Sequence, residues 1–392
     1  MIDSINVKNW MTQEEACEAL NVRKQTLYAY VSRGQIEVQD DPRHANRNLY
    51  RAADIAALVK KRSLGRARKN IAASTMAWGE PIIDTSLSTI VRGRLYYRGR
   101  DAVQLAESAT LEQVAQLLWN MDQPPRFPSF EPVPFDGPVS ARVYAALSHA
   151  AANDRTESAS DGGERVARAA ALVGRLASNF VELRPDESAL HLRIANAWGV
   201  AHHADLLRRV LVLLADQELT SSSFAARVAA STGASLGASM IAGLAAFSGP
   251  MHGNAIVRVR EFMDEAKRSG TATVVQRRIA DGDALPGFGH ELYPQGDPRA
   301  ADLLSAFDAP DAARELIDCV ERLTGKLPAI DMALAALVEH CGLPESAAFA
   351  LFSIARSVGW MAHSIEQIME GTLLRPRAHY VGPDVIDNTG GS

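Results

Sequence analysis

Three short segments in the second half of the chain each combine turn-forming residues with an ionisable side chain. They are GPMHGNAI at 249–256, PGFGHELYPQGDPRA at 286–300 and LPAID at 327–331. Glycine and proline favour turns, so each segment places a histidine or an aspartate at a turn. Such groups can act as general acids or bases. A histidine beside a glycine is more often structural than catalytic, however, so the residue types alone do not decide between the two roles.

The elements that must position these groups are predicted to be helices. Beyond residue 70 the chain is rich in Ala and Leu with helical periodicity, and only the segment around 81–97 is predicted to be extended. The stretch 225–247 is dense in Ala, Gly and Ser, which lets helix backbones approach closely. It predicts one central packed helix within a mainly α body.

The first seventy residues predict two short helices joined by a tight turn. Thr12 and Glu15 have the spacing of a capping box and would begin the first helix. Leu27 and Val31 lie four residues apart on one face of a second helix, which is expected to end at Gly34. This pattern is typical of a helix-turn-helix module.

The segment that follows the two helices extends this module. The polar stretch 40–48 could form a wing, and 53–62 a further helix, so the whole resembles the winged helix-turn-helix of MerR-type regulators and phage excisionases. Such a module could instead dock a protein. If the second helix enters a DNA major groove, its exposed face would offer side chains that contact phosphates or base edges: Lys24, Gln25, Tyr28 and Arg33.

Charge is distributed unevenly along the chain. The net charge is -5 overall, but residues 1–70 contain 13 Lys/Arg against 8 Asp/Glu, a net of +5, and the remainder contains 28 against 38, a net of -10. A basic segment at 1–70, followed by an acidic remainder, indicates that the two parts have different roles.

Cysteine usage and the absence of targeting patterns bear on the compartment. Cys17, Cys319 and Cys341 are widely separated and match no metal or disulfide spacing, which predicts a reduced compartment and no metal site. The N-terminus shows no signal pattern, and the most apolar stretch, 231–247, is interrupted by Gly and Ser. We expect a cytoplasmic protein that does not associate with membranes.

The three segments, in this order, resemble the active-site motifs of citrate synthases. The resemblance runs from about residue 81 to 383, where residues 78–119 resemble the opening segment of that family. SIARSVGWMAHSIEQ at 353–367 resembles its closing helix, and LLRPRAHYVGP at 373–383 its tail. It implies a mainly α fold with citrate synthase-like large and small helical domains.

The resemblance also implies a reaction. The family joins an acyl-CoA thioester, through its α-carbon, to the keto group of oxaloacetate and then hydrolyses the thioester, without a metal or redox cofactor. Abstracting a carbon-bound proton needs a positioned base and stabilisation of the enolate oxygen together. The resemblance assigns Asp331 as the base, His252 as the hydrogen-bond donor to the thioester oxygen, and His290 as the group that polarises and protonates the ketone.

The second substrate is a dicarboxylate, which requires cations in fork geometry. Arg299, in DPRA, and Arg375, in LRPR, match two carboxylate-binding arginines of the family. Gln217, in ADQELTSSS, stands where the family usually has a histidine that contacts oxaloacetate. All three are predicted to bind substrate.

These considerations predict the domain organisation and the assembly. Residues 1–68 form a helix-turn-helix domain, 69–80 a linker, 81–255 together with 336–392 the large domain, and 256–335 the small domain. The resemblance implies a homodimer.

Two functions agree with the sequence. The first is an acyltransferase that condenses acetyl-CoA, or a short acyl-CoA, with oxaloacetate to give citrate or 2-methylcitrate. The alternative is a catalytically weak or inactive transcriptional regulator that senses a metabolite with the same fold. A sensor has no need of a carbon-acid base, so Asp331 favours the enzyme.

Overall fold

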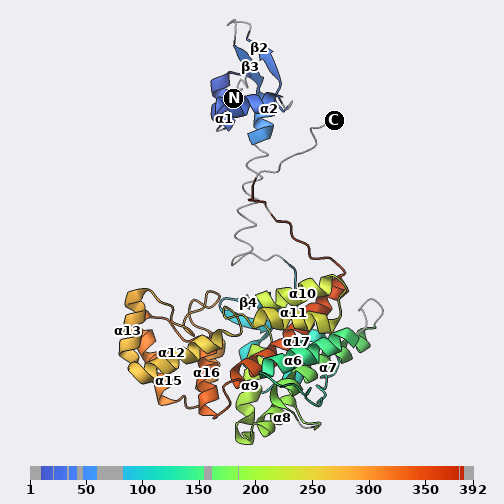
Figure 1. The fold of residues 1–392 in the computed structure, drawn as a ribbon, viewed down its shortest axis with the longest axis vertical. Coiled ribbons are helices and arrows are strands. Elements are labelled where there is room, and N and C mark those ends of the chain that lie inside the picture. Colours follow the sequence, from blue (N-terminus) through green and yellow to red (C-terminus); the bar gives the residue numbers. More distant parts are fainter. Residues whose placement is uncertain are drawn as a thin grey trace, which may run out of the picture. The chain divides into compact units, whose positions relative to one another are not determined.

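The structure is a computed structural model of the whole chain that divides into two compact units, Met1–Asp84 and Thr85–Ser392 (Figure 1). Each unit is described by itself below. The description covers residues 10–20, 22–32, 35–41, 47–59, 83–153, 161–183, 185–378 and 380–383.

The first unit contains the predicted helix pair. Thr12 and Glu15 form the expected reciprocal cap, because the Glu15 amide donates to Thr12 Oγ1 at 3.3 Å and the Thr12 amide donates to Glu15 Oε2 at 2.9 Å. Helix α1 begins directly after Thr12. The regular elements are β1 (Trp10–Met11), α1 (Gln13–Leu20), α2 (Lys24–Ser32), β2 (Val38–Asp40) and β3 (Asn48–Arg51), followed by helical residues 52–59.

A small antiparallel sheet completes this unit. Its strand order is β1-β3-β2, so β2 and β3 pair on either side of the predicted wing. The helices and the sheet bury one apolar cluster: Ala16, Leu20, Leu27, Ile36, Tyr50 and Ile55. The predicted winged helix-turn-helix is therefore confirmed as a fold, while residues 42–46 and the expected helix end at Gly34 lie outside the described residues.

The second unit opens with the extended segment that the sequence predicts. Strands β4 (Ser88–Val91), β5 (Arg94–Tyr97) and β6 (Arg100–Asp101) form an antiparallel sheet in that order. Tyr97 is fully buried, and its hydroxyl donates toward backbone carbonyls that include Val212 O at 3.0 Å. This contact anchors the small sheet against the helical body.

Helices make up the rest of the second unit, as expected for a mainly α protein. They are α4 (Ala102–Ala106), α5 (Leu111–Trp119), α6 (Val139–Asn153), α7 (Gly162–Val181), α8 (Leu190–Ala197), the 3₁₀ turn η2 (Ala201–His203), α9 (Ala204–Leu214), α10 (Ser221–Ser231), α11 (Leu236–Phe247), α12 (Ala255–Ser269), α13 (Thr271–Asp281), α14 (Pro298–Ser305), α15 (Asp311–Thr324), α16 (Ile330–His340) and α17 (Ala347–Glu370).

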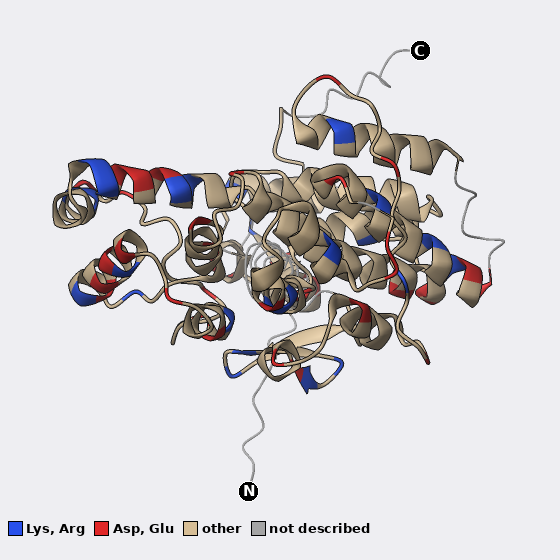
Figure 2. Ribbon diagram, turned by 90° about the horizontal axis from the view of Figure 1, so that it is seen from below, with Lys and Arg blue, Asp and Glu red and all other residues tan. Residues whose placement is uncertain are grey.

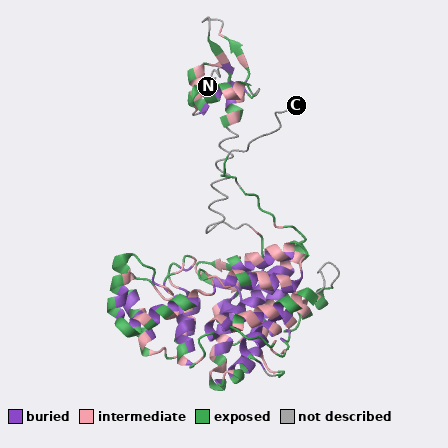
Figure 3. Ribbon diagram, in the orientation of Figure 1, coloured by how far each residue is buried: buried purple, intermediate pink, exposed green. Residues whose placement is uncertain are grey.

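Helix α17 is the centre of the larger helix group. It is buried along most of its length and packs against α5, α7, α9, α10 and α11 (Figure 3). Helices α12, α13 and α15 pack on one another, and α16 packs against α12 and α14 (Figure 1). Two helix groups are thus present, and α9 contacts α14 where they meet.

The prediction of one helix over 225–247 is wrong, because the stretch forms α10 and α11 with a break between them. Gly233 adopts a left-handed φ of 82°, which glycine tolerates at low cost, and Ser235 caps α11 by accepting the Ala238 amide. The expected close packing is present. A Cβ at Gly237 would lie 2.8 Å from the backbone of Ala151 on α6.

Charged side chains mark the outer helices, whereas the central helices are mostly uncharged (Figure 2). Three arginines depart from this pattern by being completely buried: Arg227, Arg299 and Arg356. Buried charges are costly unless they are paired or serve a ligand, so these positions are informative about function. Within the described residues, no helix combines the length and apolarity needed to cross a membrane.

Candidate active site

Two loops that carry predicted catalytic residues are paired by their backbones. Hydrogen bonds of 2.8 and 2.9 Å join residues 287–289 to residues 327–329 in an antiparallel bridge. Gly287 has a left-handed φ of 82° in this bridge, a conformation that favours glycine. His290 follows the first segment directly, and Asp331 is the second residue of the helix that follows the other. The pairing therefore brings both residues to one region.

A buried ion pair joins α14 to the start of α16. Arg299 donates to both carboxylate oxygens of Asp297, from Nε at 2.9 Å and from Nη2 at 2.7 Å. Asp297 also accepts the Ile330 amide at 3.1 Å, next to Asp331. Burial opposes ionisation of Asp297, but the charge and hydrogen bonds of Arg299 outweigh it and hold the pKa of Asp297 below its usual value.

The carboxyl group of Asp331 has the electrostatic properties of a base. Burial raises its pKa to about 6, the negative charge of Asp297 adds to this rise, and the cations Arg299 and Arg356 oppose it. All three neighbours therefore lie within electrostatic reach of Asp331. A carboxylate with a pKa near 6 is still ionised at neutral pH, yet it is more basic than an ordinary aspartate.

The histidine at position 290 is held in one tautomer. The backbone amide of Leu292 donates to its Nδ1 at 3.1 Å, so Nε2 must carry the proton of the neutral ring. Burial and the nearby charge of Arg299 lower the pKa of His290, which favours that neutral ring. The Nε2–H group is therefore a hydrogen-bond donor directed into the site.

The side-chain amide of Gln217 lies between His290 and Arg299. Its Oε1 accepts from Arg299 Nη1 at 2.6 Å, so its NH₂ group faces His290 Nε2, 3.3 Å away. Two donors then face each other, and this second contact is not a proper hydrogen bond. Among the described residues, none offers an acceptor to His290 Nε2–H, which is free for a substrate oxygen.

The histidine at position 252 lies between α11 and α12. Its Nε2 lies 2.8 Å from the Ser222 hydroxyl on α10, and its ring packs edge-on against Phe247. Burial, with a contribution from the charge of Arg356, lowers the pKa of His252 to about 4. The ring is therefore neutral at physiological pH.

Sequence reasoning missed Arg356, in the middle of α17. Its Nε donates to the Leu214 carbonyl at 3.0 Å, but Nη1 and Nη2 are buried and have no hydrogen-bond partner among the described residues. Two unsatisfied donors on one buried guanidinium match the two oxygens of a carboxylate. The signal was an arginine inside a strongly apolar helix, in the segment that resembles the family's closing helix.

The active-site loops also border a small cavity. A volume of about 220 Å³ is lined by residues that include His290, Tyr293, Asp297 and Lys326. Within the part of the chain that the structure describes, no group of three or more His, Cys, Asp or Glu residues is placed to hold a metal ion. The three cysteines are free thiols.

Comparison with known proteins identifies the family of this chain. The model of the citrate synthase C-terminal domain matches residues 133–377, more than half of the chain. The chain belongs to the citrate synthase family. Residues 10–63 separately match a helix-turn-helix domain model.

Curated relatives carry citrate synthase names. The chain is 35% identical to putative citrate synthase 2 of Mycobacterium tuberculosis over 194 residues, which is 46% of this chain and 52% of that protein. The chain thus spans about half the length of this relative. It is 26% identical to citrate synthase 2 of Bacillus subtilis over 349 residues, which is 76% of this chain and 93% of the relative.

Solved citrate synthases share the fold. The enzyme from Thermotoga maritima superimposes with a TM-score of 0.61 at 26% identity, covering 79% of this chain and 96% of that one. The citrate synthase from Thermoplasma acidophilum was solved as a ternary complex with carboxymethyl coenzyme A and oxaloacetate. It superimposes with a TM-score of 0.67 at 26% identity, covering 81% of this chain and 98% of that one.

Within this citrate synthase fold, one predicted substrate ligand lies apart from the others. Arg375 is exposed in the segment that follows α17, and no described contact joins it to Arg299 or Arg356. His252, His290, Asp331, Arg299 and Gln217 are the predicted residues that border the buried arginines.

The predicted DNA-contacting face is exposed on α2. Lys24, Gln25 and Tyr28 are all accessible, with Tyr28 51% exposed, while Leu27 on the opposite side is buried in the core of the unit. The Gln13 amide on α1 donates to the Tyr28 hydroxyl. Arg33, the fourth predicted contact, lies outside the described residues.

Proposed function

We propose that this chain is a citrate synthase-type acyltransferase that condenses acetyl-CoA, or a short acyl-CoA, with oxaloacetate to give citrate or 2-methylcitrate. The observation that carries the proposal is the position of Asp331, a carboxyl group with a pKa of about 6, next to two buried arginines. The ternary complex of the Thermoplasma acidophilum relative supports the choice of substrates.

In the first step, Asp331 removes a proton from the α-carbon of the thioester. Negative charge then develops on the thioester oxygen, which needs a hydrogen-bond donor that is already in place. His252 can supply it: when Nε2 accepts from the Ser222 hydroxyl, the proton of the neutral ring is on Nδ1, for which no described residue provides an acceptor. The pKa of about 4 keeps this ring neutral while it donates.

In the second step, the enolate carbon attacks the ketone of oxaloacetate. The Nε2–H of His290 polarises that carbonyl and protonates the oxygen as the new carbon–carbon bond forms. Water then adds its hydroxide to the thioester carbonyl and returns a proton to His290, and CoA leaves as the thiol with the proton that Asp331 took. The Leu292 amide holds the required tautomer. Water must be excluded during both steps, and closure of one helix group toward the other would achieve this.

Oxaloacetate carries two carboxylates, and the site offers two buried guanidinium groups. The free Nη1 and Nη2 of Arg356 form one ready binding fork. Arg299 is held by Asp297 on two of its nitrogens, and its Nη1 is occupied by the Gln217 oxygen, which a substrate carboxylate can displace. Gln217 can then turn its NH₂ group toward the same carboxylate.

The predicted contact of Arg375 with substrate needs either a movement of the tail or a second chain. Because Arg375 is exposed and apart from the site of its own chain, it reaches a carboxylate only if the tail moves or if a second copy supplies it. The homodimer that the family resemblance implies would provide the second copy. We therefore include the homodimer in the proposal.

The decisive measurement is thiol release from acetyl-CoA and propionyl-CoA with oxaloacetate. The proposal expects release that requires both substrates and falls about a hundredfold to ten-thousandfold in Asp331→Asn, since the catalytic base is lost. Asp264→Asn, at an exposed position on α12, removes the same charge outside the site and should leave the rate unchanged. Equal background rates in all three proteins would contradict the proposal and favour the sensor.

We further propose that the first unit binds DNA through α2. Support comes from its helix-turn-helix match and from the exposed Lys24, Gln25 and Tyr28 on one helix. Fluorescence anisotropy with genomic fragments should show binding that weakens steeply with salt, because phosphate contacts release counterions. Lys24→Ala should reduce the salt slope by about one unit. Arg268→Ala, on α12, is the matched control, and no binding at low salt would exclude the role.

A further inference from the structure

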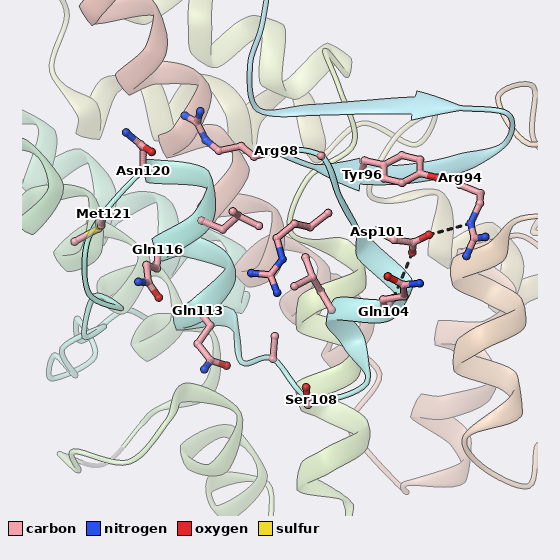
Figure 4. A pocket seen from close by; sticks show the side chains of 15 residues that line it. Arg94, Tyr96, Arg98, Asp101, Gln104, Ser108, Gln113, Gln116, Asn120 and Met121 are labelled. Atoms are coloured by element: carbon pink, nitrogen blue, oxygen red, sulfur yellow. Dashed lines mark hydrogen bonds and ion pairs between the residues drawn. The ribbon is translucent and has the colours of Figure 1, made fainter.

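A second, larger cavity opens in the body outside the residues of the active site. Its volume is about 980 Å³, and its walls are β5, β6, α4, α5 and the turns between them (Figure 4). None of the residues that line it belongs to the catalytic cluster, by which we mean the proposed active-site residues Gln217, His252, His290, Arg299, Asp331 and Arg356. Small-molecule sites typically have volumes of about 300–1,000 Å³, so the cavity has room for an organic ligand.

Three arginines and a single carboxylate line the cavity, and the carboxylate is already paired. They are Arg94, Arg98, Arg100 and Asp101, and Figure 4 shows Arg94 and Arg98 at opposite ends of the cavity. Asp101 is buried, caps α4 by accepting two backbone amides, and pairs with Arg94 Nε at 2.9 Å (Figure 4). This acid therefore neutralises one of the three arginines.

The other two arginines have no acidic partner among the described residues. Arg98 donates only to neutral oxygens, from Nε to the Leu118 carbonyl at 3.1 Å and from Nη1 to the Ser86 hydroxyl at 3.1 Å. Arg100 makes no hydrogen bond or ion pair with any described residue. The cavity thus holds two positive charges without an acidic partner among the described residues, and it attracts an anion. Arg100 can bind this anion in fork geometry, while Arg98 has only Nη2 left to donate.

Two residues on the cavity wall hold an unusual backbone conformation. Arg98 has a φ of 43° and Asn120 a φ of 55°, both in the left-handed region that non-glycine residues seldom adopt. Figure 4 shows both side chains at the border of the cavity. Both conformations have local causes, because Arg98 and Gly99 form the tight turn between β5 and β6 and Asn120 is the left-handed C-cap of α5. They fix where these two side chains lie and do not by themselves indicate a ligand.

The remainder of the cavity is suited to the neutral part of a molecule. Gln104, Ser108 and Asn120 contribute side chains that bond to no other described residue, so their donors and acceptors are available. Leu117 and Met121 add apolar surface beside them. A ligand that fills this side needs a polar organic part as well as its anionic group.

We propose that this cavity binds a phosphorylated organic molecule, either a sugar phosphate or a nucleotide. Arg98 and Arg100 bind the phosphate, and the α4–α5 side binds the sugar or base through its amides and its apolar surface. Inorganic phosphate alone would leave most of the 980 Å³ empty. The site is separate from the reaction proposed above and does not depend on it.

Isothermal titration calorimetry on the full chain at low salt tests the proposal with three probes: ribose 5-phosphate, AMP and pyrophosphate. We expect one organic phosphate to bind more tightly than pyrophosphate, and the ratio of AMP to ribose 5-phosphate affinity tells which source the site prefers. Arg100→Gln should weaken that binding about tenfold to a hundredfold, because one or two charged hydrogen bonds to the phosphate are lost.

The matched control is Arg92→Gln, which removes the same charge from an exposed arginine between β4 and β5 that does not line the cavity. It should bind the probe as the native chain does. Arg100→Lys keeps the charge but loses the fork, so an intermediate affinity is expected even if Arg100→Gln folds poorly. Three results would overturn the proposal: no binding of any probe at millimolar concentration, equal weakening by both glutamine variants, or binding of pyrophosphate alone.

Discussion

Two regions of the body gather arginines, and they differ in burial. In the active site, Arg299 and Arg356 are completely buried, and both lower the pKa of Asp331, while Arg356 also lowers the pKa of His252. In the second cavity, Arg98 is half-buried and Arg100 is exposed. The same side chain therefore shapes chemistry where water is excluded, whereas on the surface it serves recognition.

Replacing Arg356 by glutamine should have the largest effect of any arginine change. Two charged hydrogen bonds to a substrate carboxylate would be lost, each worth about 1.5–3 kcal/mol, so kcat/KM for oxaloacetate should fall about a hundredfold or more. Folding should not suffer equally, because Nη1 and Nη2 are unsatisfied in the free protein. Steady-state kinetics and thermal unfolding of the same samples separate the two effects.

Arg227→Gln is the contrasting variant, since this buried arginine is already paired with Glu366 at 2.7 Å. This variant should unfold at a lower temperature than the native chain, but its folded form should bind oxaloacetate with unchanged affinity. If Arg356→Gln behaves in the same way, with loss of stability and unchanged kinetics, then Arg356 is a structural residue and the comparison between the two regions fails.

The pH dependence of the reaction follows from the buried cluster. Asp331 works as a base only when ionised, and its pKa of about 6 means that kcat/KM should decline about tenfold per pH unit as the pH falls below 6. Arg299 and Arg356 both lower this pKa, so Arg356→Gln should move the inflection to higher pH. Rate profiles from pH 5 to 9 measure it. A kcat/KM that stays constant down to pH 5, as expected for an aspartate with the usual pKa of 3.8, would contradict the assignment of Asp331.

The same shift affects stability with a definite sign. The folded-state pKa of Asp331 lies above the unfolded value, so the folded protein loses stability as the pH rises from about 3.8 to about 6, and the full loss remains at higher pH. Asp331→Asn should therefore raise the unfolding temperature at pH 8 relative to the native chain, and this gain should vanish below pH 4. An inactive variant that is more stable than the native chain would show that its lost activity is not misfolding.

Sequence reasoning proposed residues that lie in turns or directly after one, and it missed one in the middle of a helix. His252, His290 and Asp331 follow glycine or proline in segments whose pattern is visible in the chain. Arg356 is embedded in an apolar helix, where an arginine is indistinguishable from any other buried position until its missing partners are seen. A side chain's hydrogen-bond partners are a property of packing, which the local sequence does not encode.

The fold was predictable to a similar degree. Capping at Thr12, the extended segment near residue 90 and the helical body all follow from local patterns. The break between α10 and α11 was missed because Ala, Gly and Ser continue through it, although Gly233 and Ser235 carry the turn and the cap. The second cavity could not be predicted, because it depends on how β5, β6, α4 and α5 pack together.

Gln217→His tests how the departure from the usual family residue affects the active site. The native amide has no titration near neutrality, whereas an imidazole gains a charge as the pH falls and would then attract a carboxylate. The variant should show a KM for oxaloacetate that decreases by up to about tenfold between pH 8 and pH 6, with a smaller change in kcat. Gln217→Asn, which retains an uncharged amide, is the control. A KM for oxaloacetate that does not change with pH in the histidine variant would show that residue 217 does not contact a carboxylate of oxaloacetate.

The smallest effects on stability and on thiol release are expected for Arg100, the exposed arginine of the second cavity. Arg100→Gln should change the free energy of unfolding by less than about 0.5 kcal/mol, because an exposed arginine without a described partner contributes little to stability. The rate of thiol release should also stay within about twofold of the native value, since the second cavity shares no residue with the catalytic cluster. Chemical unfolding and the thiol assay on the variant give both numbers. A loss of activity as large as that of Arg356→Gln would mean that the two arginine groups are coupled through the protein, and that burial alone does not separate their roles.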